Sequence, residues 1–330
     1  MNKILGDEIT LYESEDVDEI LPIVQEELPL RFSAEALKLL KKTNKFKQIY
    51  YYAVSKEHYA FFTLYKSRMN ILTFGKMNWY MNIGTVGYPC SLSCPGYSTD
   101  DMDFFLHAVR YVKGCKLILN VTDPVAPGKL AFGQTLPTCK FDCRFSSLEE
   151  YMSSLRSAYR RRIKLALKRC NDAGIEKKYD NNADVYRLYL NTYEKSNYKL
   201  EKMEKEFFDK VEADKIVYLL KGKAVGFTLL KKEDKLLDFM LCGMDYSIET
   251  ADLYYMMLLN IIDYAIENGC TQIDFGQTSE QTKMKFGAYL EKRYFYVHHT
   301  NVFLHNIARI GKHILEYKYS FPEYRVYKDS

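Results

Sequence analysis

A carboxylate that could act as a general base lies at the end of a short apolar segment, in the run Asp274-Phe275-Gly276. If residues 271–275 form a buried strand, Asp274 lies at its carboxyl end, where it could accept the proton of an attacking amine. The same residue could instead cap the turn that follows, and three residues alone are unspecific. The interpretation of this run as a functional motif depends on its spacing to Lys283.

Two lysines follow in the run KMKFGA at positions 283–288. A cation beside a reacting carbonyl stabilises the oxyanion that forms when an acceptor attacks. Lys283 is the candidate for that role, and Lys285 is a second cation for substrate binding. The alternative is a charged loop in contact with solvent.

Two adjacent tyrosines, Tyr254 and Tyr255, begin a long apolar segment. A phenol has an ordinary pKa near 10, so it is protonated at neutral pH and could give its proton to a leaving thiolate or alkoxide. In a chain with 29 tyrosines, packing of both rings in the core is the alternative interpretation.

A strongly basic segment lies at 155–178, where nine bases accompany two acids. In residues 151–170 the apolar positions recur every three or four residues, which predicts a helix with one buried face. Arg160, Arg161 and Lys164 could then bind a tRNA acceptor stem or a pyrophosphate-bearing substrate, and a solvated face is the alternative. We find no motif for sequence-specific reading of nucleic acid, and expect no DNA partner.

The cysteines and histidines do not favour a metal site. Cys90 and Cys94, like Cys139 and Cys143, are four residues apart, whereas structural zinc sites usually show closer pairs. The pair at 298–299 places two histidines on opposite faces of a strand. We expect buried or surface thiols, no metal and no covalently bound cofactor.

Composition limits the class of protein. A length of 330 residues suggests two domains at about 150 residues each. A hydrophobic content of 47% excludes a disordered chain. No apolar run approaches the roughly 20 residues of a membrane span, and the acidic start lacks the features of a signal peptide. The sequence therefore predicts a cytoplasmic protein without integral membrane insertion, and eight scattered cysteines agree with a reducing compartment.

The second half shows an antiparallel meander, a helix and a strand. Its predicted elements are strands at 216–220, 224–231 and 236–242, a helix over 253–268 capped by Asp252 or Thr250, strands at 271–275 and 294–298, and a helix near 301–317. The first half repeats this order, with strands at 49–54, 59–65 and 70–74, a helix over 102–112 capped by Asp100 or Asp101, and a strand at 116–121. Each helix leads into a similar junction, GCKLI from Gly114 and GCTQI from Gly269. This order predicts a tandem duplication of one α+β unit, with chance similarity as the alternative.

The run at 154–168, the helix that ends at Gly269 and the motifs at 274–276 and 283–288 together resemble the C-terminal half of Fem-type (FemAB-like) aminoacyltransferases and their GNAT-like acyltransferase relatives. The resemblance covers residues 150–330 well and 30–145 loosely, with a weaker likeness at 86–91. It implies two GNAT-like domains and transfer of an acyl or aminoacyl group to an amine, and it places Lys283 at the position of the family lysine. By analogy with that fold, the backbone N–H groups of Gly243 and Met244 could bind the donor carbonyl.

Two departures from the family pattern concern the acyl donor. Gln277 stands where the family often has an arginine, and the glycine-rich phosphate loop of acetyl-CoA enzymes is absent before Leu253. Without those glycines, backbone amides cannot curl closely around a pyrophosphate. The donor therefore stays open among acyl-CoA, a carrier-protein thioester and aminoacyl-tRNA, with tRNA or an acyl carrier protein as the corresponding partner.

These observations predict an α+β protein with mixed, mostly antiparallel sheets and tandem GNAT-like domains at 1–145 and 146–330. The second domain opens with a basic helix at 150–170 and carries the acyl-transfer site. The predicted enzyme is an N-acyltransferase acting on an amine acceptor, in cell-wall (peptidoglycan) or peptide-type metabolism. The alternative is an inactive GNAT-fold protein that binds RNA or a cell-wall precursor.

Overall fold

The computed structural model describes residues 1–5, 9–70, 79–90, 92–126, 128, 130–196, 201–248 and 252–328. The chain forms two compact units, each assembled from three segments. Unit 1 consists of Met1–Leu136, Asn197–Phe207 and Lys292–Tyr319, and unit 2 of Pro137–Ser196, Phe208–Glu291 and Ser320–Ser330. The limits expected from the sequence, 1–145 and 146–330, are a single cut along the chain, whereas these units interleave.

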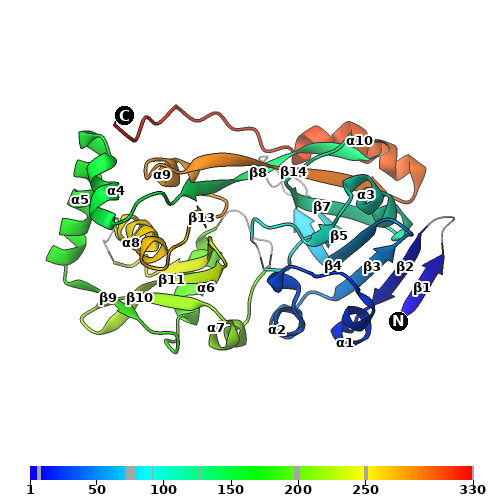
Figure 1. Ribbon diagram of the computed structural model, residues 1–330, viewed down its shortest axis with the longest axis horizontal. Helices are drawn as coiled ribbons and strands as arrows, with labels where there is room; N and C mark the ends of the chain where they lie inside the picture. Colours follow the sequence, from blue (N-terminus) through cyan, green and yellow to red (C-terminus); the bar gives the residue numbers. More distant parts are fainter. Residues whose placement is uncertain are drawn as a thin grey trace. The chain divides into compact units, whose positions relative to one another are not determined.

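Unit 1 is built on one mixed sheet (Figure 1). Its strands are β1 (Asn2–Leu5), β2 (Thr10–Ser14), β3 (Gln48–Val54), β4 (Tyr59–Asn70), β5 (Tyr80–Val86), β6 (Tyr97–Thr99), β7 (Cys115–Val121) and β14 (Tyr289–His299) from residue 292 onward. In the order β1-β2-β3-β4-β5-β7-β14, neighbours are antiparallel except β5 and β7, which are parallel. The predicted strand at 70–74 lies outside the described residues beyond Asn70, where β4 ends.

The helices of unit 1 are α1 (Val17–Ile20), α2 (Ala34–Thr43), α3 (Met102–Tyr111) and α10 (Val302–Leu315), with 3-10 turns at Leu21–Ile23 and Leu30–Phe32. The buried core joins the sheet to one face of α3, through Phe105, Ala108 and Val109.

The strands of unit 2 are also mixed in direction and follow the order β8-β13-β12-β11-β10-β9. Its strands are β8 (Ala131–Asp142) from residue 137 onward, β9 (Ile175–Tyr179), β10 (Asp214–Leu220), β11 (Lys223–Glu233), β12 (Leu236–Met244) and β13 (Gln272–Asp274). Only β12 and β13 are parallel among these described pairs. The helices are α4 (Leu148–Ser154), α5 (Ser157–Asp172), α6 (Tyr186–Lys195), α7 (Lys205–Lys210), which crosses the unit boundary, α8 (Leu253–Glu267) and α9 (Glu280–Met284).

The two halves of the sequence exchange their last strands. β8 follows β7 along the chain but pairs with β13 in unit 2, with Phe141 opposite Ile273. β14 follows β13 but pairs with β7 in unit 1, with Val297 opposite Leu117. Each unit thereby contains a strand from the other half of the sequence.

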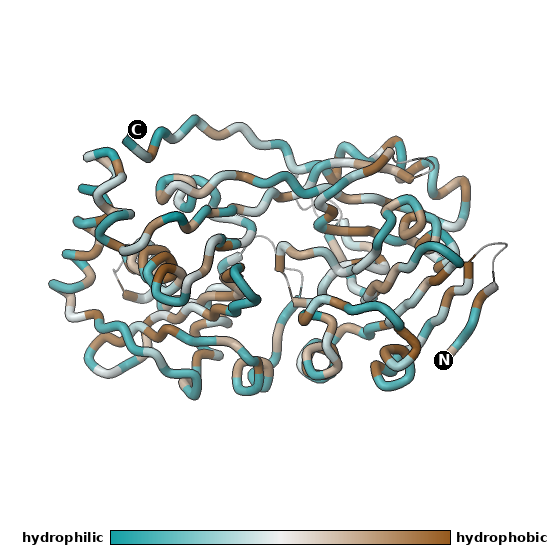
Figure 2. Tube along the Cα trace, in the orientation of Figure 1, coloured by the Kyte–Doolittle hydropathy of each residue, from teal (hydrophilic) through white to brown (hydrophobic). Residues whose placement is uncertain are grey.

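Helices α3 and α8 occupy equivalent places along the chain, because each follows the first parallel strand of its unit and precedes the second. Asp101 caps α3, because its carboxylate accepts the N–H of Phe104 at 2.6 Å. Gly114 and Gly269 follow the two helices with φ of 93° and 64°, a conformation that favours glycine. Helix α8 is hydrophobic nearly all round (Figure 2) and is buried between the strands β11 and β13 and the helix α5. The predicted duplication is thus present in the fold.

The single helix predicted over 151–170 is wrong, because α4 and α5 are separate helices. Leu155 and Arg156 between them are extended and meet the C-terminal segment, with Leu155 bridged to Tyr327. The N–H of Arg156 donates to the carbonyl oxygen of Val326 at 2.9 Å instead of continuing a helix.

Among the described residues, no helix combines the length and apolar character needed to cross a bilayer.

Candidate active site

The parallel strands of each unit pair over three residues and then separate, and we call this point the fork of the unit. In unit 2, β12 pairs with β13 from Leu236 to Asp238 and then continues to Met244 along β11 alone. The chain after β13 turns at Gly276, whose φ is 71°. Hydrogen bonds from Phe275 N–H to Cys139 O (2.8 Å) and from Cys139 N–H to Gly276 O (3.1 Å) hold this turn against β8.

Asp274 is at the end of β13, as predicted, but its carboxylate is already paired. Oδ1 accepts the Thr138 hydroxyl at 2.5 Å and the Gly276 N–H at 2.7 Å, and Oδ2 forms an ion pair with Lys140 Nζ at 2.9 Å. The side chain is only 7% exposed. A buried carboxylate with these partners organises the turn, and it meets an amine only if one of them moves away.

Lys283 is also engaged by the loop. Its Nζ donates to the carbonyl oxygens of Gly276 at 3.1 Å, Gln277 at 2.9 Å and Thr278 at 2.7 Å, and the residue is 2% exposed. An ammonium has three donors, so none remains for an oxyanion in this arrangement. Burial lowers the pKa of Lys283, and the neighbouring Cys139 and Cys242, followed by two carboxylates, act against that shift. The second predicted cation, Lys285, is half-buried with Nζ 5.6 Å from the centre of the Tyr324 ring.

The two adjacent tyrosines have different surroundings. Tyr254 lies at the fork: burial raises the pKa of its phenol well above the usual value, the neighbouring Cys242 and Cys139 add to the rise, and a hydrogen bond with Ser279 opposes it. Tyr255 instead packs its ring 4.2 Å below the Arg162 guanidinium and 5.2 Å from the Phe286 ring. The fork therefore contains the phenol of Tyr254, which is protonated at neutral pH.

The backbone at Gly243 and Met244 is covered by α6. A Cβ at Gly243 would lie 2.4 Å from the backbone of Leu188. The N–H of Met244 donates to Thr192 Oγ1 at 3.2 Å, and the N–H of Asp245 donates to Val225 O at 2.8 Å. The close approach of α6 thus occupies the Met244 donor that was expected to meet a substrate carbonyl.

Five of the six basic residues of α5 fall into two sets. Arg162 and Arg169 bind Asp252 at 2.5 and 3.0 Å, which ties α5 to the start of α8. Asp252 holds the predicted N-cap position, but this pairing replaces the side-chain cap. Arg161 and Lys164 are exposed, and Arg160 reaches only the Ser153 carbonyl at 3.4 Å. The second set could meet a polyanion.

Two residues at the site were not singled out from the sequence. Thr138 and Lys140 lie on the same side of β8, two residues apart, and both contact Asp274. Polar residues at alternate positions of an apolar segment are the available signal, because side chains alternate between the faces of a strand. Burial also raises the pKa of the Cys242 thiol to about 11 and that of Cys139 to about 12, so neither is a ready nucleophile.

No cluster of metal-ligating side chains occurs in the part of the chain that the structure describes. All eight cysteines are free thiols.

No family model matches the chain, and a search of curated proteins also finds no match. Solved structures are similar at low identity. The C-terminal domain of a protein described as a lysylphosphatidylglycerol synthetase from Agrobacterium fabrum gives a TM-score of 0.51 at 13% identity, covering 78% of this chain and 85% of that one. A tandem GNAT protein from the clavulanic acid biosynthesis pathway gives 0.47 at 8% identity (89% and 99%), and FemX gives 0.43 at 14% (82% and 92%).

Of these three, the Agrobacterium domain alone exceeds a TM-score of 0.5, and at 13% identity it shows a shared fold and nothing about substrates. The chain itself contains two copies of a strand–strand–strand–helix–strand unit with parallel strands around the helix. The predicted class, α+β with mixed, mostly antiparallel sheets in a tandem GNAT-like arrangement, is confirmed.

Proposed function

We propose that this protein is an acyltransferase that moves an activated acyl or aminoacyl group to an amine at the fork of unit 2. One observation carries the proposal: the phenol of Tyr254 lies beside Cys242 of β12 and Ser279 of the loop after β13. The parallel strands separate at that point, so β12 no longer pairs with β13 beyond Asp238, and α6 contacts its end at Met244.

The reaction would proceed by direct attack. The amine nitrogen bonds to the carbonyl carbon, the bond from that carbon to sulfur or oxygen breaks, and Tyr254 protonates the leaving group. The amine then returns a proton to the phenolate, so the enzyme ends unchanged. We propose that Lys283 and Asp274 act as positioning residues, because their hydrogen bonds fix the carbonyls and the turn of the loop beside Tyr254.

The donor would be an acyl-CoA, a carrier-protein thioester or an aminoacyl-tRNA. The unpaired set on α5, Arg160, Arg161 and Lys164, supports a polyanionic donor such as tRNA or a carrier. The resemblance of 154–168 and 283–288 to Fem-type enzymes supports an acceptor from cell-wall or peptide-type metabolism. Eight free thiols support a cytoplasmic location.

One observation favours the alternative, a binding protein of the same fold without chemistry. The two charged groups that could assist transfer, Asp274 and Lys283, are both engaged in hydrogen bonds within the loop. In that case the fork would bind an acyl or aminoacyl compound and release it unchanged.

The test is turnover with each donor class against a panel of amines, followed by mass spectrometry of the products. Tyr254→Phe removes one hydroxyl and should lower kcat by about 10²- to 10⁴-fold, the range of general acid catalysis. Tyr255→Phe is the matched control and should keep turnover, because its ring packs between Arg162 and Phe286. Equal turnover in both variants would remove Tyr254 from the mechanism, and binding of a donor without any product would support the alternative.

A further inference from the structure

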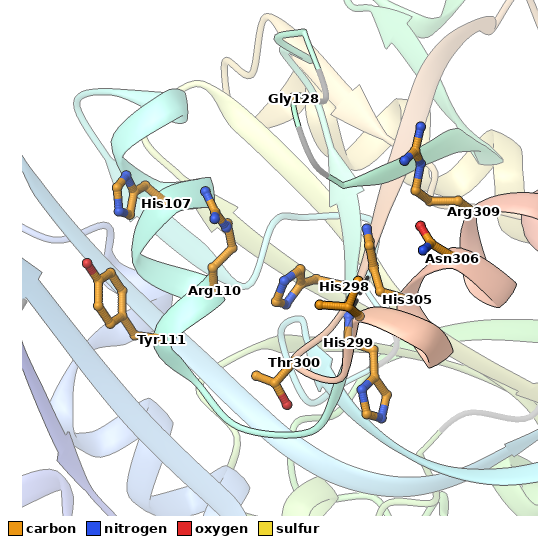
Figure 3. Close-up of a pocket in the computed structure, with 11 residues that line it drawn as sticks. His107, Arg110, Tyr111, Gly128, His298, His299, Thr300, His305, Asn306 and Arg309 are labelled. Atoms are coloured by element: carbon orange, nitrogen blue, oxygen red, sulfur yellow. Dashed lines mark hydrogen bonds between the residues drawn. The ribbon is translucent and has the colours of Figure 1, made fainter.

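A cavity of about 680 Å³ lies in unit 1, between α3, the end of β14 and the first turns of α10. Figure 3 shows its lining side chains, with Arg110 and His298 in the space between the two helices. His305 of α10 is beside His298, with ring centroids 5.2 Å apart. None of these residues belongs to the proposed acyl-transfer site, so the inference below does not depend on that proposal.

The lining of the cavity is cationic. It includes four histidines and two arginines, Arg110 and Arg309, and no aspartate or glutamate. Neither arginine forms an ion pair with any carboxylate that the structure describes. In a chain with 43 acidic residues, this is a local excess of positive charge that attracts anions.

A buried polar atom in the same lining lacks a partner. Nδ1 of His298 is inaccessible to solvent and has no hydrogen bond within the described parts of the chain. Burial, followed by the positive charges of Lys116, His305 and Arg110, lowers the pKa of His298 to about 4. An anion in the cavity would reverse the electrostatic part of that shift and allow the ring to donate a hydrogen bond.

The shape and chemistry favour an organic phosphate. Guanidinium groups match phosphate oxygens with two parallel hydrogen bonds. The volume exceeds what a phosphate group alone would fill and falls in the range of about 300–1,000 Å³ typical of small-molecule sites. The lining also includes His107 and Tyr111, whose rings are stacked with centroids 5.6 Å apart and planes 10° apart.

We propose that this cavity binds the phosphate group of an organic phosphate, with Arg110 and Arg309 as its cationic contacts. The phosphate could belong to a soluble metabolite or to a lipid headgroup. Helix α10 supports a lipid source. On its outer face, next to the cavity, Phe303 is 72% exposed and Ile310 is 81% exposed. Amphipathic helices with apolar outer faces lie in membrane interfaces.

The experiment has two arms that separate these sources. Calorimetry measures binding of glycerol 3-phosphate, and co-sedimentation measures binding to phosphatidylcholine vesicles with and without phosphatidic acid. Arg309→Gln is exposed and should leave the fold intact, and Arg110→Gln is the second pocket variant. Arg68→Gln is the matched control, because it removes the same charge from unit 1 at β4, outside the cavity lining. Ile310→Ser changes only the apolar face of α10.

We expect each pocket variant to weaken binding at least tenfold, the effect of losing one charged hydrogen-bonded contact, while Arg68→Gln binds as the original protein does. Binding of glycerol 3-phosphate with this pattern identifies a soluble source. Binding only to vesicles that contain phosphatidic acid, weakened by Arg309→Gln and by Ile310→Ser, identifies a lipid source. Equal binding by Arg309→Gln and Arg68→Gln, or no binding in either arm, would overturn the proposal.

Discussion

The forks of the two units have the same topology and different contents. In unit 1, β4 pairs with β5 from Leu64 onward and with β6 at Ala60–Phe62, so β6 takes the place along β4 that β5 leaves. The loop before β6 is pressed onto the backbone of Gly87 at Gly96. In unit 2, β12 is continuous, and the fork receives side chains from α8 and α9, among them Tyr254 and Lys283.

This difference shows how a duplicated fold can divide its roles. In unit 1 the backbone of the loop before β6 fills the fork. The Asn120 and Arg293 side chains donate hydrogen bonds to the carbonyl oxygens of Leu92 and Ser93 in this loop. Side chains that can donate protons occupy the fork of unit 2. The large cavity of unit 1 lies elsewhere, between α3, the end of β14 and α10, and its chemistry is cationic rather than acid–base.

Replacing the buried lysine of each unit should give the largest difference between the two units in the free energy of unfolding. Lys283→Met leaves three loop carbonyls without their donor, and we expect the free energy of unfolding to fall by about 3 kcal/mol, since each unpaired buried group costs about 1–3 kcal/mol. Among the described residues Lys116 donates only to the Val112 carbonyl, and burial lowers its pKa to about 8, so Lys116→Met should cost about 1 kcal/mol. Chemical denaturation measures both, and equal losses would contradict the contrast between the forks.

Replacing one glycine in each fork should give a smaller difference in the free energy of unfolding. A Cβ at Gly96 would lie 2.1 Å from the Gly87 backbone, so Gly96→Ala must displace main chain and should cost about 2 kcal/mol. At Gly276 the nearest atom would be 3.7 Å away, and only the φ of 71° is unfavourable, at about 1 kcal/mol. Thermal unfolding of both variants ranks them. A larger loss for Gly276→Ala would mean that the unit 1 fork is not closed by this backbone contact.

Much of the order of elements could be predicted from the sequence, because local periodicity and turn residues encode it. The meander at 216–242 appears as β10, β11 and β12, and the helices that end before Gly114 and Gly269 appear as α3 and α8. The exchange of β8 and β14 could not be predicted, since the apolar pattern of a strand does not specify which other strand it pairs with. The break between α4 and α5 depends on a bond to Val326, which is 170 residues from Arg156.

The candidate site was predictable by position more than by role. Asp274, Lys283 and Tyr254 all lie at the fork of unit 2, as their place after a strand or at the start of α8 indicated. Their roles depend on which hydrogen bonds are already made, and those involve Thr138, Lys140 and loop carbonyls that no local pattern reveals. The packing of Tyr255 under Arg162 likewise depends on how α5 approaches α8.

Because ion pairs join α5 to the start of α8, the free energy of unfolding should depend on pH. Burial pushes the pKa of Asp252 upward, but its bonds to Arg162 and Arg169 outweigh this and leave the pKa below 3.8. The unfolded chain then binds more protons at low pH, so this stabilisation is complete above the unfolded pKa and is lost as the pH falls through the folded one. Asp252→Asn should cost about 1 kcal/mol near pH 7, with the difference shrinking as the pH falls through the lowered pKa of Asp252. Urea titrations at several pH values measure it, and a constant difference would contradict the pairing.

The smallest stability effect should come from the unpaired basic residues of α5. Because Arg161 is exposed and Arg160 makes one long contact, the double variant Arg160→Gln/Arg161→Gln should change the free energy of unfolding by less than about 0.5 kcal/mol. The matched variant Arg162→Gln/Arg169→Gln removes the same charge from the same helix but breaks both bonds to Asp252, so it should be measurably less stable.

Polyanion binding should show the opposite ranking. If the donor is a tRNA that contacts the unpaired set, Arg160→Gln/Arg161→Gln should reduce the slope of log K against log salt by about 1.5, since each phosphate contact contributes about 0.7–0.9. The paired variant should keep a slope closer to that of the original protein, because Arg162 and Arg169 are held by Asp252, which offsets one of their two charges. Filter binding of aminoacyl-tRNA across a salt series measures the slopes. Equal slopes in the two variants would make the exposed basic face of α5 a solvated surface and leave acyl-CoA as the donor to pursue.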